Sequence, residues 1–255
     1  MKNNIKNQKY WEDRIILKDK LLEKDIKKIE KKLLKAFKDT RKEILNELKI
    51  IYSDIESTEY AKYRIDSLLA SVNIALDNLY NKNEELLTKA FIDLYRKFDK
   101  EASIDLGVSF NVINENLIRE VISNNWSGLS FSERIWEHRR KLALTLKEEL
   151  TKGLIRGDSL QDISRVMADK LNNSYQNSLR LVRTESCFVM NEATINNYKD
   201  NDIKAYQFMA FLDKKTSKQC REMDNKIISI EEYKIGVNCP PLHPNCRSAI
   251  APVID

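Results

Sequence analysis

Proline and glycine are almost absent from the greater part of this chain. None of the first 239 residues is a proline, and none of the first 106 is a glycine. Proline breaks a helix because it removes a donor and clashes with the preceding turn, and glycine weakens one, so their absence predicts long, uninterrupted helices. With 42% hydrophobic and 33% charged residues, the composition excludes a disordered tail and a proline-rich linker. All four prolines lie in the tail, at Pro240, Pro241, Pro244 and Pro252.

Apolar residues recur at helical spacing through the body of the chain, on stripes separated by lysine and glutamate. Breaks are expected at Gly107 and at the polar stretch 123–128, and the next helix is expected to stop near Gly153. Helices this long and one-sided must pack on each other or on a partner, and an antiparallel bundle is favoured. The stripes predict helices over about 8–52, 58–80, 84 into the early hundreds, 130–153, 159–171 and 175–198.

The residue pattern changes after Asn201. Three short segments, 205–212, 226–230 and 248–253, have the aromatic or β-branched content of strands. We therefore expect a mainly α fold with a small C-terminal β-containing module (α+β). Long N-terminal helices (1–120) would precede a compact helical platform that carries a short sheet and a Cys/His knuckle (121–255).

The positive charge is concentrated in the first hundred residues. Residues 1–100 carry 23 Lys/Arg and 18 Asp/Glu, whereas the remainder carries 21 of each. A cluster of lysines stands on the first predicted helix, but acidic residues are interleaved with it. The cluster fits a solvated helix face, with contact to DNA phosphates as the alternative. Its members are Lys27, Lys28, Lys31, Lys32 and Lys35.

The most specific local feature is a Cys/His knuckle. Cys239, His243 and Cys246 are spaced C-x3-H-x2-C, and Cys220 precedes them at a distance. Tetrahedral zinc accepts such mixtures of ligands, so we expect one structural zinc ion on these four residues. The alternative is that the thiols and the imidazole simply pack within a proline-rich turn. We expect the remaining cysteine, Cys187, to be a buried small hydrophobe on a helix.

Arg183, Thr184 and Glu185 form a compact polar trio in an otherwise apolar predicted helix. Residues two apart point to different sides of a helix, so Arg183 and Glu185 should not pair with each other. We expect one of them to reach the β module, with Asp213 as the candidate partner. The alternative is two ordinary solvated charges.

The sequence contains few groups suited to catalysis or to membrane insertion. There are two histidines, no phosphate-binding glycine loop and no His-Glu-x-x-His pair. No apolar run reaches the roughly 18–20 residues that span a bilayer, and the start does not resemble a signal peptide. We expect no enzymatic activity, no membrane segment and no effector domain after the knuckle.

Several segments together resemble the phage head-morphogenesis family, the Mu F-like minor head proteins. The resemblance spans about 124–253, and its last forty residues are the most specific part. The segments that carry it are Trp126–Gly128 with Phe131–Trp136, Gly153–Ser159, Leu181–Glu185, Leu212–Ser217 with Cys220, and Pro240–Arg247.

The resemblance implies a minor capsid protein of a tailed bacteriophage or prophage. Such a protein would act in prohead assembly beside the portal and other head or scaffold proteins. It would be located in the virion, and in the host cytoplasm during assembly. Alternatives are a DNA-binding or ejection protein that uses the basic helix, and a metal-dependent enzyme or toxin-related module. The family's motif residues fall on Arg183, Thr184, Glu185, Asp213, Thr216, Cys220, His243, Cys246 and Arg247, whereas Cys239 stands where the motif has no regular cysteine.

Overall fold

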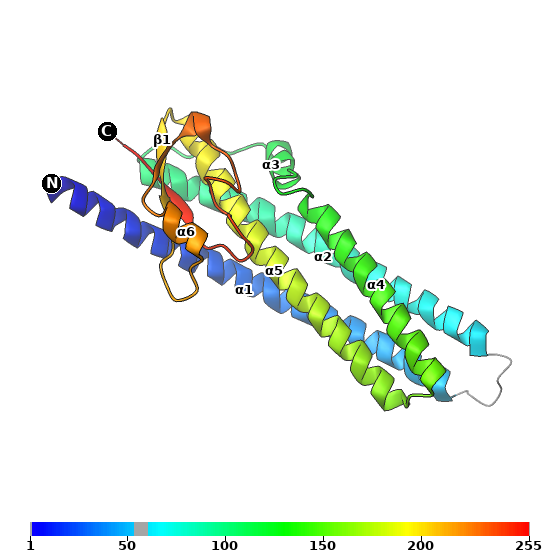
Figure 1. Cartoon of the computed structure of the whole chain (residues 1–255). Coiled ribbons are helices and arrows are strands. Elements are labelled where there is room, and N and C mark those ends of the chain that lie inside the picture. The colour runs from blue at the N-terminus through cyan, green and yellow to red at the C-terminus, as the bar shows by residue number, and fades with distance from the viewer. Residues whose placement is uncertain (1, 54–60, 255) are drawn as a thin grey trace. The chain divides into compact units, whose positions relative to one another are not determined.

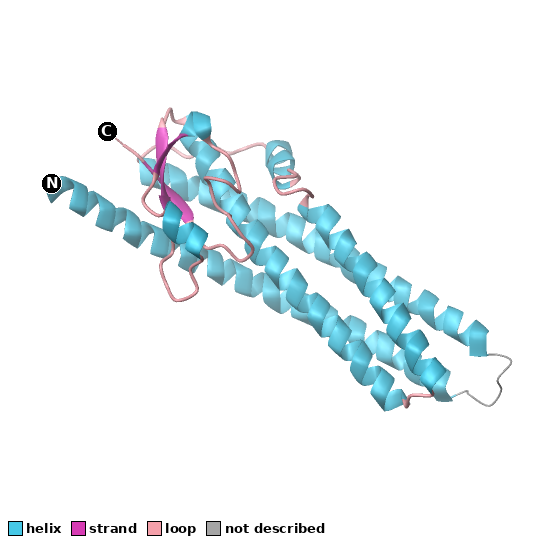
Figure 2. Ribbon diagram, in the orientation of Figure 1, coloured by secondary structure: helices cyan, strands magenta, loops and turns pink. Residues whose placement is uncertain are grey.

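A computed structural model describes residues 2–53 and 61–254 of the chain. Most of these residues are helical, and the only strands among them lie near the C-terminus (Figures 1 and 2). The mainly α fold with a small β-containing module is therefore confirmed. The elements are α1 (Lys2–Ser53), α2 (Ala61–Leu106), α3 (Glu115–Ile122), α4 (Phe131–Arg156), α5 (Leu160–Asp200), β1 (Ala205–Met209), α6 (Lys218–Met223), β2 (Ile227–Ser229), η2 (Ile230–Glu232) and β3 (Ala249–Pro252).

The helices are longer than the periodicity predicts. The expected second and third helices are one continuous helix, α2, and the expected pair over 159–171 and 175–198 is α5. The prediction of three shorter helices between 130 and 198 is therefore wrong, because only α4 and α5 are present there. Polar residues at the supposed breaks belong to the buried face: Asn83 is 3% exposed and Ser174 is 6% exposed. Neither gap contains a proline or glycine that would end a helix.

Two short helices were not predicted. Asn114 caps α3 by accepting the amide hydrogen of Asn116, and Ser217 caps α6 by accepting that of Cys220. Both are typical N-cap residues. Segments of six to eight residues are too short to give a clear helical period. Only the cap signals could have revealed them.

The chain forms two compact units. One, which we call unit 1, contains residues 1–28, 88–131 and 180–255, and the other, unit 2, contains residues 29–87 and 132–179. Each unit draws on both sides of the sequence-based boundary at 120–121, and that division into domains stays a prediction.

Unit 2 is built from four helical segments belonging to α1, α2, α4 and α5. Their buried faces carry the apolar stripes that the sequence predicts, including Leu33, Leu76 and Leu146, each fully buried. The Phe37 ring packs edge-on against the rings of Tyr80, at 6.3 Å between centroids, and Tyr175, at 5.6 Å. Unit 2 is thus a helical body with an aromatic centre.

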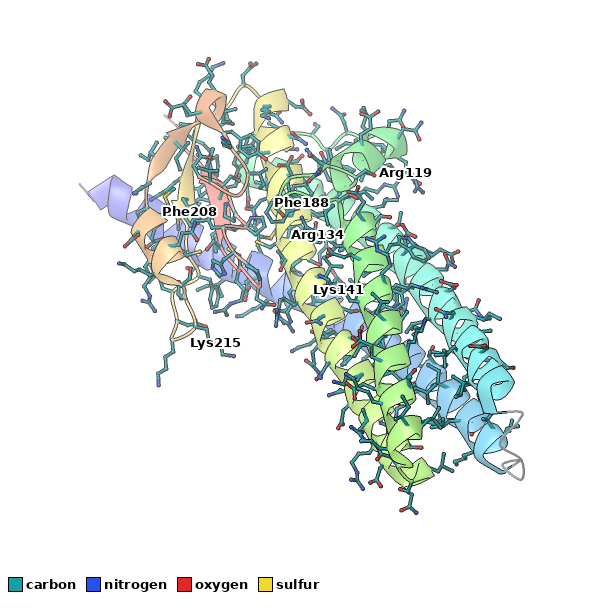
Figure 3. All side chains as sticks on the ribbon, turned by 45° about the vertical axis from the view of Figure 1, so that its right-hand side comes forward. Arg119, Arg134, Lys141, Phe188, Phe208 and Lys215 are labelled. Atoms are coloured by element: carbon teal, nitrogen blue, oxygen red, sulfur yellow. The ribbon has the colours of Figure 1, made fainter. Side chains whose placement is uncertain are left out.

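Unit 1 is organised around the second half of α5. Every residue from 184 to 195 is buried, as expected for a helix that is covered on all sides. The three strands form an antiparallel sheet in the order β2-β1-β3, with Phe208 opposite Ile250. Phe208 of β1 and Phe188 of α5 are both fully buried (Figure 3). The sheet and the knuckle contribute to one core with α5 residues such as Cys187, Ile195 and Tyr198.

Ion pairs join α1 to α2 within unit 1. Arg14 donates to Asp105, with 2.6 Å between Nε and Oδ1, and to Glu101. Lys18, only 2% exposed, lies 2.6 Å from the other Asp105 oxygen. Because a buried charge is costly without its partner, these pairs fix how α1 lies on α2.

Candidate metal centre

Three of the four predicted ligands gather at one point of unit 1. The ligand atoms of Cys220, His243 and Cys246 all lie within 4.8 Å of one another. Cys220 Sγ lies 3.2 Å from His243 Nε2 and 3.7 Å from Cys246 Sγ. Cys220 is placed by α6, whose N-terminal cap holds its amide. His243 and Cys246 come from one tight turn, closed by the Cys246 amide donating to the His243 carbonyl.

The donor set and its spacing fit a zinc ion. Bonds of about 2.3 Å from zinc to sulfur and about 2.0 Å to nitrogen place tetrahedral ligands about 3.8 Å (sulfur to sulfur) and about 3.5 Å (sulfur to nitrogen) apart. The distances found here are within a few tenths of an ångström of both. His243 Nδ1 is 2.9 Å from the Pro244 carbonyl oxygen. Because a carbonyl can only accept, Nδ1 carries the proton and Nε2 presents its lone pair toward the thiols.

Without a metal the thiols are held in the protonated form. The hydrogen bond from Cys246 and then burial raise the pKa of the Cys220 thiol. A hydrogen bond with Cys187, together with burial, raises the pKa of the Cys246 thiol to about 11. Zinc would reverse this preference because it binds thiolates, so its binding would release protons.

The fourth predicted ligand is placed elsewhere. Cys239 is fully buried, but it does not belong to the group of mutually close ligand atoms. Burial, followed by the charge of Glu192, raises the pKa of the Cys239 thiol. Cys187, expected to be a buried small side chain, is indeed fully buried in α5.

The polar trio on α5 divides between three partners. Arg183 Nη1 lies 2.7 Å from a carboxylate oxygen of Glu23 in α1, and Glu185 accepts the Trp126 indole N–H at 3.1 Å. The expectation that Arg183 or Glu185 reaches the β module stays a prediction. Thr184 reaches it, because its hydroxyl accepts the Asn245 amide hydrogen at 3.0 Å. The Trp126 ring also stacks on Phe188, with centroids 5.4 Å apart.

Asp213, Thr216 and Arg247 form a second cluster of motif residues. Arg247 forms an ion pair with Asp213, and its guanidinium lies 4.5 Å from the centroid of the Phe211 ring. Arg247, first of all, and the Lys215 amide hold the pKa of Asp213 below its usual range. The Thr216 hydroxyl accepts the Asp213 amide hydrogen and donates to the Phe211 carbonyl, each at 2.7 Å. These bonds shape the loop before α6, where Lys215 projects (Figure 3).

The lysine cluster lies on the exposed side of α1. Lys28 forms an ion pair with Asp25 at 2.7 Å, and that same Asp25 also pairs with Lys97. Lys32 and Lys35 line a groove of about 310 Å³ in unit 2 together with Asp39, Glu43 and Lys82. The mixture of charges seen in the sequence is therefore present on the surface. All five lysines, Lys27, Lys28, Lys31, Lys32 and Lys35, are exposed.

Part of the C-terminal region is similar to a known protein family. Residues 144–251 match the model of the family described as Phage Mu protein F like protein. The match supports a Mu F-like phage head morphogenesis domain in this segment. The segment includes α5, β1, β2, most of β3 and all three clustered ligands. The match supports a protein related to phage heads, as the motif resemblance predicts.

A curated relative matches about half of the chain. The NAD(+)–arginine ADP-ribosyltransferase EFV of Enterococcus faecalis (strain ATCC 700802 / V583) is 27% identical over 137 residues, which are 52% of this chain. The matched part is 28% of the relative's own length, so the chain spans well under a third of that protein. No solved structure matches the chain significantly. In the part of the chain that the structure describes, no helix has the length and apolarity needed to cross a membrane.

Proposed function

We propose that this protein is a minor capsid (head) protein of a tailed bacteriophage or prophage. It acts in prohead assembly beside the portal, with other head or scaffold proteins as further partners, and it is located in the virion after assembly in the host cytoplasm. The observation that carries the proposal is the match of residues 144–251 to the Mu F-like family.

The proposal is tested by co-purification with the portal protein of the same phage. Residues 1–28 and 88–100 belong to the unit that holds the knuckle, so a truncation of 1–100 would damage both units. The full-length chain must therefore be used, with the portal protein of an unrelated phage as the control. We expect retention of the cognate portal only. Failure to retain it, both as free subunits and as assembled rings, would contradict the assignment beside the portal.

We further propose that Cys220, His243 and Cys246 hold one structural zinc ion. The metal would stabilise the module and would have no catalytic role. Elemental analysis of protein purified without chelators should give one zinc per chain. His243→Ala should lose the metal, and His138→Ala, which changes the other histidine of the chain, should keep it. Wild-type protein without stoichiometric metal would refute the zinc site.

A second candidate function is contact with phage DNA through the exposed lysines of α1. Phosphate contacts release counterions, so retention on DNA should fall steeply between about 50 and 200 mM salt. The triple variant Lys31→Glu, Lys32→Glu and Lys35→Glu should then lose retention. A matched triple change on α4, at the exposed Lys141, Lys147 and Lys152, should not. Retention on DNA that does not depend on salt concentration, or that is unchanged in the α1 triple variant, would reject this candidate.

We propose that the protein is not an enzyme. The relative's name assigns an ADP-ribosyltransferase activity to a much longer protein, so the shared stretch can be a common assembly module rather than its catalytic part. We expect no transfer of ADP-ribose from NAD+ to arginine-containing acceptor proteins by the purified chain. Transfer that depends on an intact knuckle would favour the toxin-related alternative instead.

A further inference from the structure

Cys187 lies beside the three clustered ligands although it is distant from them in the sequence. It stands on the buried half of α5 with 0% of its surface exposed. Its Sγ is 3.5 Å from the Ser248 carbonyl oxygen, two residues beyond Cys246. The Cys187 thiol is also the first of the groups that raise the pKa of the Cys246 thiol, so the two side chains are neighbours. A fourth sulfur therefore borders the site from the α5 side.

Cys239 has different neighbours. It pairs with Ile235 through an isolated β-bridge, and its side chain is fully buried. Cys220 Sγ lies 3.7 Å from Cys246 Sγ, whereas the Cys239 thiol is outside the group of ligand atoms that lie within 4.8 Å of one another. Closeness along the chain to His243 does not bring Cys239 into the site.

The surroundings of Cys187 suit a metal-bound thiolate. Asn191, 1% exposed, donates from Nδ2 to Cys187 Sγ at 3.5 Å and to the Ser248 carbonyl at 3.3 Å. Three thiolates and one neutral imidazole around Zn2+ leave one net negative charge in a buried place. An N–H donor to sulfur offsets part of that charge, as the outer partners of metal ligands commonly do.

We propose that Cys187 of α5, and not Cys239, is the fourth ligand of a tetrahedral zinc site with Cys220, His243 and Cys246. The inference rests on the zinc site proposed above. Cys187 is outside the 4.8 Å group, so its thiol must turn toward the metal. A cysteine can do this by rotation about χ1 alone. The metal would then bond the knuckle and α6 directly to α5, so it would attach the whole module to the central helix of unit 1.

Cobalt substitution distinguishes the two ligand sets. Metal-free protein is titrated with Co2+, and the thiolate-to-cobalt absorption and the protons released per metal are measured. Wild type and Cys239→Ala should both show three thiolates and release about three protons, because each ligand thiol must ionise. Cys187→Ala should show about one third less thiolate absorption and release about two protons. Circular dichroism of the metal-free variants checks that each is folded.

The Cys239→Ala result decides the matter even if Cys187→Ala does not fold. The chain has four cysteines, so a three-sulfur site that survives loss of Cys239 must contain Cys187. X-ray absorption at the zinc edge of zinc-loaded Cys239→Ala should accordingly count three sulfurs and one nitrogen. Two sulfurs there, or three in Cys187→Ala, would overturn the inference while leaving the zinc proposal standing. Wild type that binds neither zinc nor cobalt would overturn both.

Discussion

At the scale of single residues, the knuckle contains side chains of two kinds. Cys220, His243 and Cys246 present donor atoms to one point, whereas Thr184 fixes the turn between them by binding the Asn245 amide. Asn245 has a φ of 60°, a left-handed conformation that asparagine tolerates better than most residues. The motif Pro-Asn-Cys thus combines a turn former with a ligand. The order of residues in this motif therefore reflects the geometry of the turn as well as metal chemistry.

Glu192 should make stability depend on pH. Burial raises the pKa of this carboxyl to about 7 in the folded protein, against an ordinary 4.5. The folded state therefore binds more protons between these values, so the free energy of unfolding should fall as pH rises from about 4.5 to 7, by up to about 3 kcal/mol. Glu192→Gln should remove that fall and be the more stable protein at pH 8. Urea unfolding at several pH values measures this, with the exposed Glu148→Gln as the control. A Glu192→Gln variant whose stability falls with pH as steeply as that of the wild type would contradict this explanation.

Asp105 should be essential because it neutralises a buried lysine. Asp105→Asn would leave Lys18, 2% exposed, with an uncompensated charge. Breaking a buried pair in this way typically costs about 3–5 kcal/mol. Glu101→Gln is a suitable control, because the Glu101 carboxylate is partly exposed and forms an ion pair with Arg14 but not with Lys18. Denaturant unfolding should show a large loss for Asp105→Asn only, and equal losses would argue against the burial of Lys18.

Residues close together in the sequence were predicted better than distant ones. The spacing of His243 and Cys246 already indicated one ligand pair, and Cys220 was expected to join them as a more distant ligand. The same reasoning favoured Cys239 over Cys187 as the fourth zinc ligand, because it relied on closeness in the sequence rather than closeness in the fold. The partner of Arg183 is Glu23, 160 residues away, and no local pattern could have revealed it. Trp126 was noticed for its motif, but its bond to Glu185 depends on the fold.

At the scale of elements, the absence of proline and glycine predicted the helices, and Gly107 correctly marked the end of α2, but the continuity of α2 and α5 was missed. The predicted helices left gaps at 81–83 and 172–174, although Asn83 and Ser174 are buried within continuous helices. Ser174 is held there by a 2.6 Å hydrogen bond with the Tyr80 hydroxyl. Gly153 was taken as a helix end, yet α4 continues to Arg156. A helix can therefore continue through a buried polar residue or a tightly packed glycine, even where the local sequence suggests that it ends.

Gly153 is required by the close approach of a neighbouring helix. A Cβ at this position would come within 2.8 Å of Ile163 Cγ1 in α5. Gly153→Ala should therefore destabilise the protein by about 1–3 kcal/mol, despite the better helix propensity of alanine. Adding Ile163→Ala should make the glycine change harmless or favourable in a double-mutant cycle measured by thermal unfolding. Additive losses would show that the contact is not the cause.

At the scale of the whole molecule, the two units are built from interleaved stretches of the chain. Unit 1 takes residues from the beginning, middle and end, so the knuckle depends on helices that the sequence assigned to a separate N-terminal region. Composition could not reveal this, because long helices carry the same apolar stripe through both units. The family match, at residues 144–251, also includes parts of both units. The matched domain therefore does not coincide with a compact unit.

Removal of metal should affect the two units differently. Zinc stabilises only the structure that contains its ligands, by an amount set by its concentration and affinity. All proposed ligands lie in residues 180–255 of unit 1. A chelator should therefore speed amide hydrogen exchange in residues 180–254 and leave residues 132–179 unchanged. Equal acceleration in both ranges, or in neither, would contradict a zinc ion that stabilises the module locally.

The central claim is that this protein is built into phage heads. Quantitative mass spectrometry of purified proheads and mature heads tests it most directly. We predict a few copies per head, at a constant ratio to the portal protein in every preparation. Absence from both kinds of particle, in cells that make the protein and assemble heads normally, would contradict the account.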